Sequence, residues 1–145
     1  MNTYDISSDP SRLQPDAIHA YLTRSYWSPG IPKDVVVRGI ANALCFGIYL
    51  GESQVGFARV ITDKASFAYL ADVYVLEEHR GQGLSKRLVE KILAHPDLQG
   101  LRRVLLATAD AHGLYAQFGF APLARPQNMM EIRNPPAWLQ AEAAR

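Results

Sequence analysis

The sequence contains little that could support a disulfide or a metal centre. Cys45 is its one cysteine, so neither an intramolecular disulfide nor a cysteine-based cluster can form within the chain. Four histidines are scattered along it, which does not favour a histidine-ligated metal. We therefore expect no metal cofactor. Because Cys45 has apolar neighbours, we expect it to be a reduced and buried core residue.

The sequence also lacks an excess of charge and a long hydrophobic run. Fifteen Lys and Arg residues balance fourteen Asp and Glu residues, which leaves a net charge of +1. This balance does not provide the broad positive field that carries non-specific nucleic-acid binding. No apolar run approaches the roughly 18 residues that span a bilayer, and residues 1–11 lack the pattern of a secretory signal. We expect a cytoplasmic protein with neither nucleic acid nor a membrane as a partner.

Enough apolar material is present for one hydrophobic core. The chain has 145 residues, of which 48% are hydrophobic, and a chain of this length commonly forms one domain. We predict a single domain over residues 1–145. Within it, residues 126–145 are rich in proline and are expected to form a loosely structured C-terminal tail, anchored by Trp138.

Hydrophobic periodicity predicts an alternation of strands and helices. Strands are expected at residues 3–6, 44–50, 54–61, 67–76, 103–107 and 120–123, and residues 51–53 form the turn of a hairpin. Helices are expected from Pro15, from Pro32, at 84–93 and at 111–118. This order predicts an α/β (α+β) fold in which helices pack on a mixed sheet.

One turn between a predicted strand and a predicted helix has the composition of an anion site. It reads Arg80, Gly81, Gln82, Gly83, Leu84, Ser85. A helix that begins here directs free backbone amides and the positive end of its dipole at the turn, which favours a phosphate. The two glycines allow close approach of the backbone, and Arg80 adds a positive charge. The alternative is a tight connection with no ligand.

Two other phosphate-binding patterns do not fit this turn. The Walker pattern requires Gly-x-x-x-x-Gly-Lys-Ser/Thr, which the letters after Gly81 do not supply. The dinucleotide pattern Gly-x-Gly-x-x-Gly requires a third glycine where Lys86 and Arg87 stand.

The turn resembles motif A of the GNAT acetyltransferase superfamily, in which Gln/Arg-x-x-Gly-x-Gly/Ala follows a strand. Ser85 occupies the last position, where it keeps the backbone amide and adds a hydroxyl. A second segment, residues 108–120, is similar to the pattern Asn-x-x-Ala-x-x-Leu-Tyr-x-x-x-Gly-Phe of the same family. The matching residues are Ala111, Leu114, Tyr115, Gly119 and Phe120, whereas Thr108 replaces the Asn.

This resemblance implies a fold and a reaction. GNAT-like sheets are mixed and mostly antiparallel, are flanked by helices, and contain a strand that splays from its neighbour at the cofactor site. The implied reaction moves an acetyl group from acetyl-CoA to a primary amine, of a small molecule or a peptide, by direct attack. Small enzymes of this type often form homodimers. A non-catalytic acyl-CoA-binding or sensing module is the alternative function.

The resemblance also implies roles for particular residues. Pantetheine would pair with the strand segment Val73, Tyr74 and Val75, whose N–H groups would polarise the thioester carbonyl. The pyrophosphate would lie on the turn from Arg80 to Ser85, and Thr108 would lie near the pantetheine arm. Tyr115 occupies the position of the general acid that protonates the departing thiolate.

The general base is left open by the sequence. Asp72 is the strongest candidate, because a carboxylate among apolar strand residues requires a partner or a function. A salt bridge is the other explanation for it. The remaining candidates are Glu77, Glu78, His79 and His112, any of which could act through water.

The amine-binding residues are equally open. Tyr26 and Trp27 lie in a segment rich in aromatics and turn formers, which favours a substrate-contacting loop. They could also fold back onto the core. Met129, Met130 and Trp138 of the tail are further candidates, and a site of this composition would suit an amine with an apolar or aromatic body.

Overall fold

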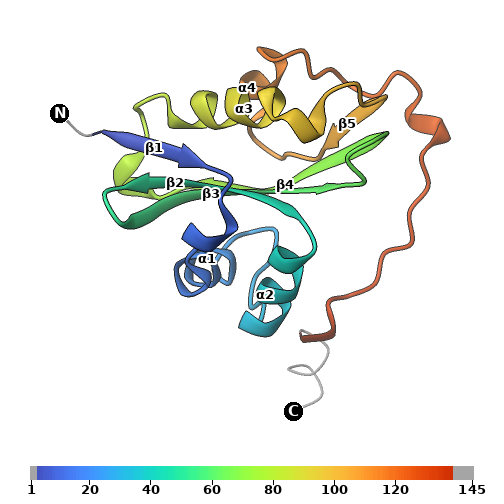
Figure 1. The fold of residues 1–145 in the computed structure, drawn as a ribbon. Coiled ribbons are helices and arrows are strands. Elements are labelled where there is room, and N and C mark those ends of the chain that lie inside the picture. The colour runs from blue at the N-terminus through green and yellow to red at the C-terminus, as the bar shows by residue number, and fades with distance from the viewer. Residues whose placement is uncertain (1–2, 139–145) are drawn as a thin grey trace.

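The computed structural model describes residues 3–138 of the chain. In this range a mixed sheet of five strands, in the order β1-β2-β3-β4-β5, is covered by helices on both faces (Figure 1). The strands are β1 (Tyr4–Ser7), β2 (Leu44–Leu50), β3 (Ser53–Thr62), β4 (Phe67–Val75) and β5 (Arg103–Leu106). The helices are α1 (Pro15–Leu22), α2 (Lys33–Ala41), α3 (Leu84–Ala94) and α4 (His112–Ala116). The sheet and its flanking helices confirm the predicted fold class.

Strands β4 and β5 separate along their length. All neighbouring strands are antiparallel except β4 and β5, which are parallel and pair only from Phe67–Arg103 to Leu70–Leu106. Beyond Leu70, β4 continues to Val75 while pairing with β3 alone. The splayed strand expected from the sequence is therefore present, and it leaves one edge of β4 open.

The sheet carries a hydrophobic core on each face. The larger core packs α3 against the sheet, with Leu88 and Val89 fully buried. The smaller core packs α1 and α2 against the other face through Ile18, Val36 and Phe57. Cys45 belongs to the smaller core, is 5% exposed, and has a pKa raised to about 11 by desolvation. The expectation of a buried, inert thiol is confirmed.

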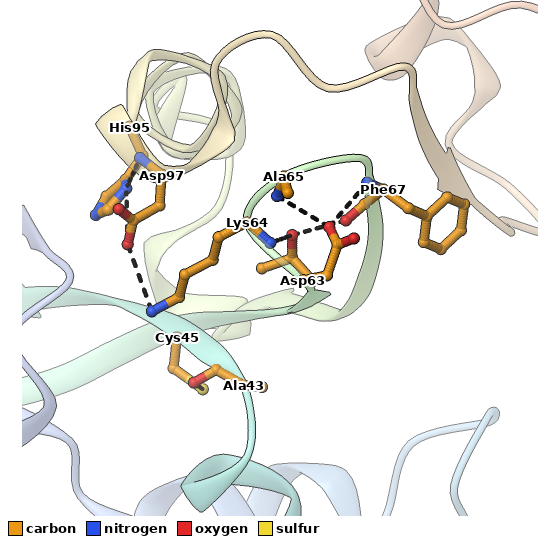
Figure 2. A network of polar contacts seen from close by, with 9 residues as sticks. Ala43, Cys45, Asp63, Lys64, Ala65, Phe67, His95 and Asp97 are labelled. Carbon is orange, nitrogen blue, oxygen red and sulfur yellow. Dashed lines mark hydrogen bonds and ion pairs between the residues drawn. The ribbon is translucent and has the colours of Figure 1, made fainter.

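The turn between β3 and β4 fixes where β4 begins. Asp63 accepts hydrogen bonds from the N–H groups of Ala65 (2.9 Å) and Phe67 (3.1 Å), as Figure 2 shows, and from Ser66 (2.8 Å). The Ser66 hydroxyl, which also donates to Asp63, and then these N–H groups hold the pKa of Asp63 well below its usual range. Lys64, at φ +62°, extends toward Asp97 with 3.6 Å between the charged atoms (Figure 2). The start of β4 is therefore held in place next to β5.

One predicted strand, residues 120–123, is wrong. After α4, Gly119 adopts φ +93°, and the N–H of Phe120 donates back to the Tyr115 carbonyl (3.3 Å). This reversal packs the Phe120 ring edge-on against Tyr115. Pro122 then removes a donor that a strand would need. The apolar residues after α4 thus support Tyr115 instead of extending the sheet.

The C-terminal segment crosses from one side of the sheet to the other. Figure 1 shows it running from the α4 side toward α2. Residues 124–135 are all exposed, and near its end the Trp138 indole donates to the Pro29 carbonyl (3.1 Å). Trp138 therefore anchors the tail as predicted, up to residue 138; the predicted tail residues 139–145 lie outside the described range. Within residues 3–138, no helix has the length and apolarity that a bilayer crossing needs.

Candidate active site

A cleft of about 1000 Å³ lies beside the open edge of β4. Residues 69–75 of β4 form its floor, residues 106–111 with Tyr115 form one side, and Tyr21, Arg24, Tyr26 and Trp27 form the other. Arg80 and Ser85 close one end. The cleft therefore brings together both sequence motifs and the aromatic loop.

The open edge of β4 presents free backbone donors to the cleft. The Leu76 N–H donates to the Val55 carbonyl on β3 (2.9 Å). Because N–H directions alternate along a strand, the N–H groups of Val75 and Val73 point to the open side. The Tyr74 side chain instead enters the smaller core, where it is 4% exposed and stacks on Tyr21 at 4.0 Å. Two backbone donors and no bulky side chain thus face the gap between β4 and β5.

The turn that follows β4 leads directly into the N-terminus of α3, a geometry that favours an anion. Gly81 and Gly83 adopt φ +78° and +76°, and α3 begins at Leu84 directly after Gly83. A Cβ at either glycine would meet nothing within 4 Å, so packing within the protein does not require glycine there. Leu84 is 3% exposed and anchors the first helical turn in the larger core. The free amides of this turn fit a pyrophosphate.

The side chains of the turn differ in where they point. The Arg80 guanidinium donates to the Val75 carbonyl (2.8 Å) and to the Tyr21 hydroxyl (2.9 Å), and it borders the cleft. Ser85 also lines the cleft. Gln82 donates to the Tyr4 hydroxyl (3.1 Å), so its side chain braces the turn from β1. Arg80 and Ser85 are therefore the side chains of the turn placed to contact a ligand.

Tyr115 lies where the second motif meets the cleft. It is 7% exposed, and its pKa is raised by desolvation and by the nearby Tyr26 and Asp110. Burial of this kind keeps the phenol protonated. The Thr108 hydroxyl accepts from the Ala111 N–H (3.0 Å) and so holds the segment that precedes α4. Thr108 also lines the cleft, and its place near the pantetheine arm stays a prediction.

Asp72 is held by two partners at a bulge in β4. It adopts φ +56°, opposite a register shift between Phe57 and Arg59 on β3. One carboxylate oxygen accepts from the Arg59 Nε (2.8 Å) and the other from the Trp27 indole (2.9 Å). Its side chain is only 12% exposed. The salt bridge left open by the sequence is therefore present, together with a tie to the aromatic loop.

The aromatic side of the cleft combines stacked rings with a second ion pair. Tyr26 is 63% exposed and meets Trp27 edge-on, whereas Trp27 is 37% exposed. Arg24 lies over the Tyr21 ring and donates to both carboxylate oxygens of Glu77, at 2.7 and 3.0 Å. Arg24 lowers the pKa of Glu77. The loop is thus partly open to a ligand and does not fold entirely onto the core.

Several other candidates lie away from the cleft. His79 pairs with the Tyr4 hydroxyl (2.8 Å), and His112 is exposed; neither lines the cleft among the described residues. Met129 and Met130 are 42% and 96% exposed on the tail and do not line the cleft. Within residues 3–138, no group of three His, Cys, Asp or Glu side chains is arranged to hold a metal ion.

Sequence reasoning missed Tyr21 and Arg24 as residues of the site. Tyr21 fits the apolar stripe of α1 and was therefore expected in the core. The density of aromatic residues at 21, 26 and 27, around one arginine, is the signal that could have grouped them.

Comparison with known proteins identifies related sequences and folds. The sequence profile of the acetyltransferase (GNAT) family matches residues 9–120. The protein FG08082 of Gibberella zeae, named as a candidate acetyltransferase, is 35% identical over 137 residues, which cover 79% of this chain and 76% of that protein.

Comparison with solved structures also finds acetyltransferases. The crystal structure of xcc2953 from Xanthomonas campestris pv. campestris, described as a candidate GNAT acetyltransferase, is 51% identical with a TM-score of 0.91, covering 95% of this chain and 98% of that one. A structure with acetyl-CoA, of a protein from Clostridium acetobutylicum described as a predicted acetyltransferase, has a TM-score of 0.66, covering 92% and 96% of the two chains. At 13% identity, that second likeness concerns the fold alone.

Proposed function

The chain belongs to the acetyltransferase (GNAT) family and is an acyltransferase, and we propose that it moves an acetyl group from acetyl-CoA to a primary amine by direct attack. Use of acetyl-CoA is general in this family. A single domain over residues 1–145, a homodimer and a cytoplasmic location stay predictions of the sequence.

One observation carries the proposal: a strand edge with free N–H groups, a glycine turn at a helix N-terminus and a buried phenol line the same cleft. A domain that binds no cofactor does not require these three features in one cleft. Each of the three features suits a different part of one extended thioester ligand. Together they favour the transferase over an interaction domain whose turn is only a connection.

We assign coenzyme binding mainly to the backbone. The amides of residues 81–85 would hold the pyrophosphate at the N-terminus of α3, with Arg80 and Ser85 as side-chain contacts. The open edge of β4 would pair with the pantetheine arm as an added strand does. The N–H group of Val73 would donate to the thioester carbonyl, where negative charge develops during acyl transfer, and that of Val75 would pair with the pantetheine arm.

The chemical step then needs two proton movements. Acetyl-CoA supplies an activated acetyl group when bound. The amine nitrogen bonds to the acetyl carbon, the carbon–sulfur bond breaks, and Tyr115 donates its phenolic proton to sulfur. The nitrogen loses one proton in this step, and water in the exposed cleft returns a proton to the Tyr115 phenolate. An amine that arrives as an ammonium group first loses another proton to water. Because burial raises the pKa of Tyr115, the phenol is in its donating form at neutral pH.

Asp72 fits the binding of the amine better than the removal of its proton. Both of its carboxylate oxygens already accept a hydrogen bond, one from Arg59 and one from Trp27. The carboxylate is therefore already used to hold Arg59 and the aromatic loop. It still has room for further donors, because a carboxylate offers about four acceptor positions. We propose that Asp72 orients both the loop and the amine.

Binding of acetyl-CoA tests the proposal first. Addition of the ligand at about one hundred times its Kd stabilises a protein by about 2.7 kcal/mol, which raises the Tm of a domain of this size by several degrees. We expect this shift for the wild type. Gly83→Asp should abolish it, because a carboxylate at the pyrophosphate position repels the anion. The φ of +76° at Gly83 makes an aspartate strained there, so circular dichroism should confirm that the variant still folds.

Gly51→Asp is the matched control, because Gly51 has φ +60° in the β2–β3 turn, where a Cβ also meets nothing within 4 Å. This variant should keep the shift. A wild type without any shift would refute the proposal. A shift without thiol release in the presence of amines would favour the acyl-CoA-binding module instead.

A further inference from the structure

A second cavity lies on the other side of Asp72. It has a volume of about 250 Å³ and lies between α2 and the sheet. Six of its lining residues are apolar: Leu22, Ile31, Val35, Val36, Ile40 and Phe57. Nothing in the coenzyme-binding role described above uses it.

Asp72 lies in the wall that this cavity shares with the cleft. Among the described residues, it is the one that lines both spaces. It directly precedes Val73, whose N–H points to the open edge of β4 where the thioester carbonyl would be held. A ligand group at Asp72 would therefore be next to the reacting carbonyl, and the remainder of the ligand could extend under α2.

Three charged residues also line the second cavity. Arg59 donates its Nε to Asp72, and Arg38 is an exposed residue of α2 whose charge is screened by water and salt. Gly39 leaves space beside the Arg59 guanidinium, since a Cβ there would lie 3.6 Å from it. The cavity is thus largely apolar, with Asp72 in the wall that it shares with the cleft.

Its size sets the size of the ligand. An apolar cavity of about 150 Å³ can bind benzene, so about 250 Å³ holds one ring and a short chain. An ammonium group is complementary to the Asp72 carboxylate. The apolar body of the amine is complementary to Ile31, Val35 and Ile40, the half-buried side chains of the lining.

We propose that the acceptor is a primary amine with an uncharged apolar or aromatic body, and that this body binds in the cavity under α2 with its nitrogen at Asp72. This inference rests on the proposed acetyl transfer and specifies its substrate class. The loop residues Tyr26 and Trp27 then cover the amine nitrogen and the thioester, while the side chains of α2 discriminate between amines by the apolar part of the molecule.

Direct binding of amines tests the proposal without turnover. Isothermal titration calorimetry on the full chain, loaded with coenzyme A, would compare 2-phenylethylamine with ethanolamine, which lacks the ring. We expect the wild type to bind 2-phenylethylamine ~10-fold more tightly or better, as apolar pockets commonly discriminate. L-Phenylalanine, which adds a carboxylate to the same ring, should bind no more tightly than 2-phenylethylamine.

Two helix variants separate the cavity from its surroundings. Val35→Trp fills the cavity and should remove the preference for the ring, whereas Val37→Trp, on the same helix but 43% exposed and outside the cavity lining, should keep it. If Val35→Trp does not fold, Gly39→Leu also fills the cavity and improves helix propensity. Acetyl-CoA binding should persist in every folded variant.

The outcomes are distinct. Equal or absent binding of the two amines by the coenzyme-loaded wild type would overturn the inference, as would tighter binding of L-phenylalanine. The inference would also be overturned if the folded cavity-filling variant and Val37→Trp showed the same preference for 2-phenylethylamine over ethanolamine. Loss of coenzyme A binding by the wild type would instead mean that the proposed acetyl transfer itself is wrong.

Discussion

The two walls of the cleft are built by different means. The coenzyme wall consists of β4 residues 73–75, the turn 80–85 and Tyr115, and it offers mainly main-chain N–H groups. The amine wall consists of Tyr21, Arg24, Tyr26 and Trp27, and it offers side chains alone. The coenzyme wall is thus defined by backbone shape, and the amine wall by residue identity.

The two walls are also held in place by different contacts. Leu84, Tyr115 and Val75 connect the coenzyme wall to the larger hydrophobic core. The loop of the amine wall is tied down by separate polar contacts, including Trp27 to Asp72 and Arg24 to Glu77. We therefore expect substitutions in the coenzyme wall to act on the chemical step and those in the amine wall to act on amine affinity.

The largest effect is expected from Tyr115→Phe. This change keeps the ring and its contact with Phe120 but removes the proton donor, so kcat should fall about 10²- to 10⁴-fold. The KM for acetyl-CoA should change little, as should Tm. Steady-state thiol release gives kcat and KM for the wild type, Tyr115→Phe and Tyr69→Phe. Tyr69→Phe is the control, because Tyr69 lines the same cleft without an assigned role. Equal kcat in the two variants would remove Tyr115 as general acid.

A smaller effect is expected from Asp72→Asn. Loss of the carboxylate leaves Arg59 without its ionic partner, and since both side chains retain some exposure, at 12% and 23%, we expect a destabilisation of about 1–3 kcal/mol. The KM for the amine should rise about tenfold with the KM for acetyl-CoA unchanged, if the residue orients the amine. Urea unfolding and initial rates check both.

Trp27→Phe tests the same contact as Asp72→Asn with a milder change. It removes the indole donor and keeps a ring, so its effect on the KM for the amine should be smaller. If instead Asp72→Asn lowers kcat and eliminates the acidic limb of the pH profile, Asp72 is a general base and the orienting role is wrong.

The smallest effect is expected from alkaline pH. The general acid must be protonated, and burial raises the pKa of Tyr115 above its usual value of about 10. The fraction of protonated Tyr115 should therefore stay near one up to about pH 9. A plot of log kcat against pH should show no loss from this group between pH 8 and pH 9. A decline there that Tyr115→Phe abolishes would contradict the raised pKa.

Much of the coenzyme wall could be predicted from the sequence because local patterns determine it. The glycine spacing, the helical stripe after it and the register of Tyr115 with Gly119 each act over a few residues. The misplaced strand at 120–123 shows the limit, since the reversal at Gly119 and the donor missing at Pro122 outweighed an apolar run.

The contacts of the amine wall could not be predicted from the sequence, because they join segments that are far apart in the chain. Trp27 and Asp72 are 45 residues apart, and the bulge that turns Asp72 toward the loop depends on pairing with β3. The cavity under α2 also depends on how a helix lies on the sheet. Its apolar residues are indistinguishable in sequence from those that fill a core.

The bond from Trp138 to Pro29 has a consequence for the order of assembly. The two residues are 109 positions apart, and Pro29 lies in the loop that carries Tyr26 and Trp27. A contact between such distant segments closes a large chain loop, which costs more entropy than the local contacts of a turn and a helix. The turn 80–85 and α3 can therefore form before the aromatic loop has its anchor, and we expect the acceptor side to be completed last.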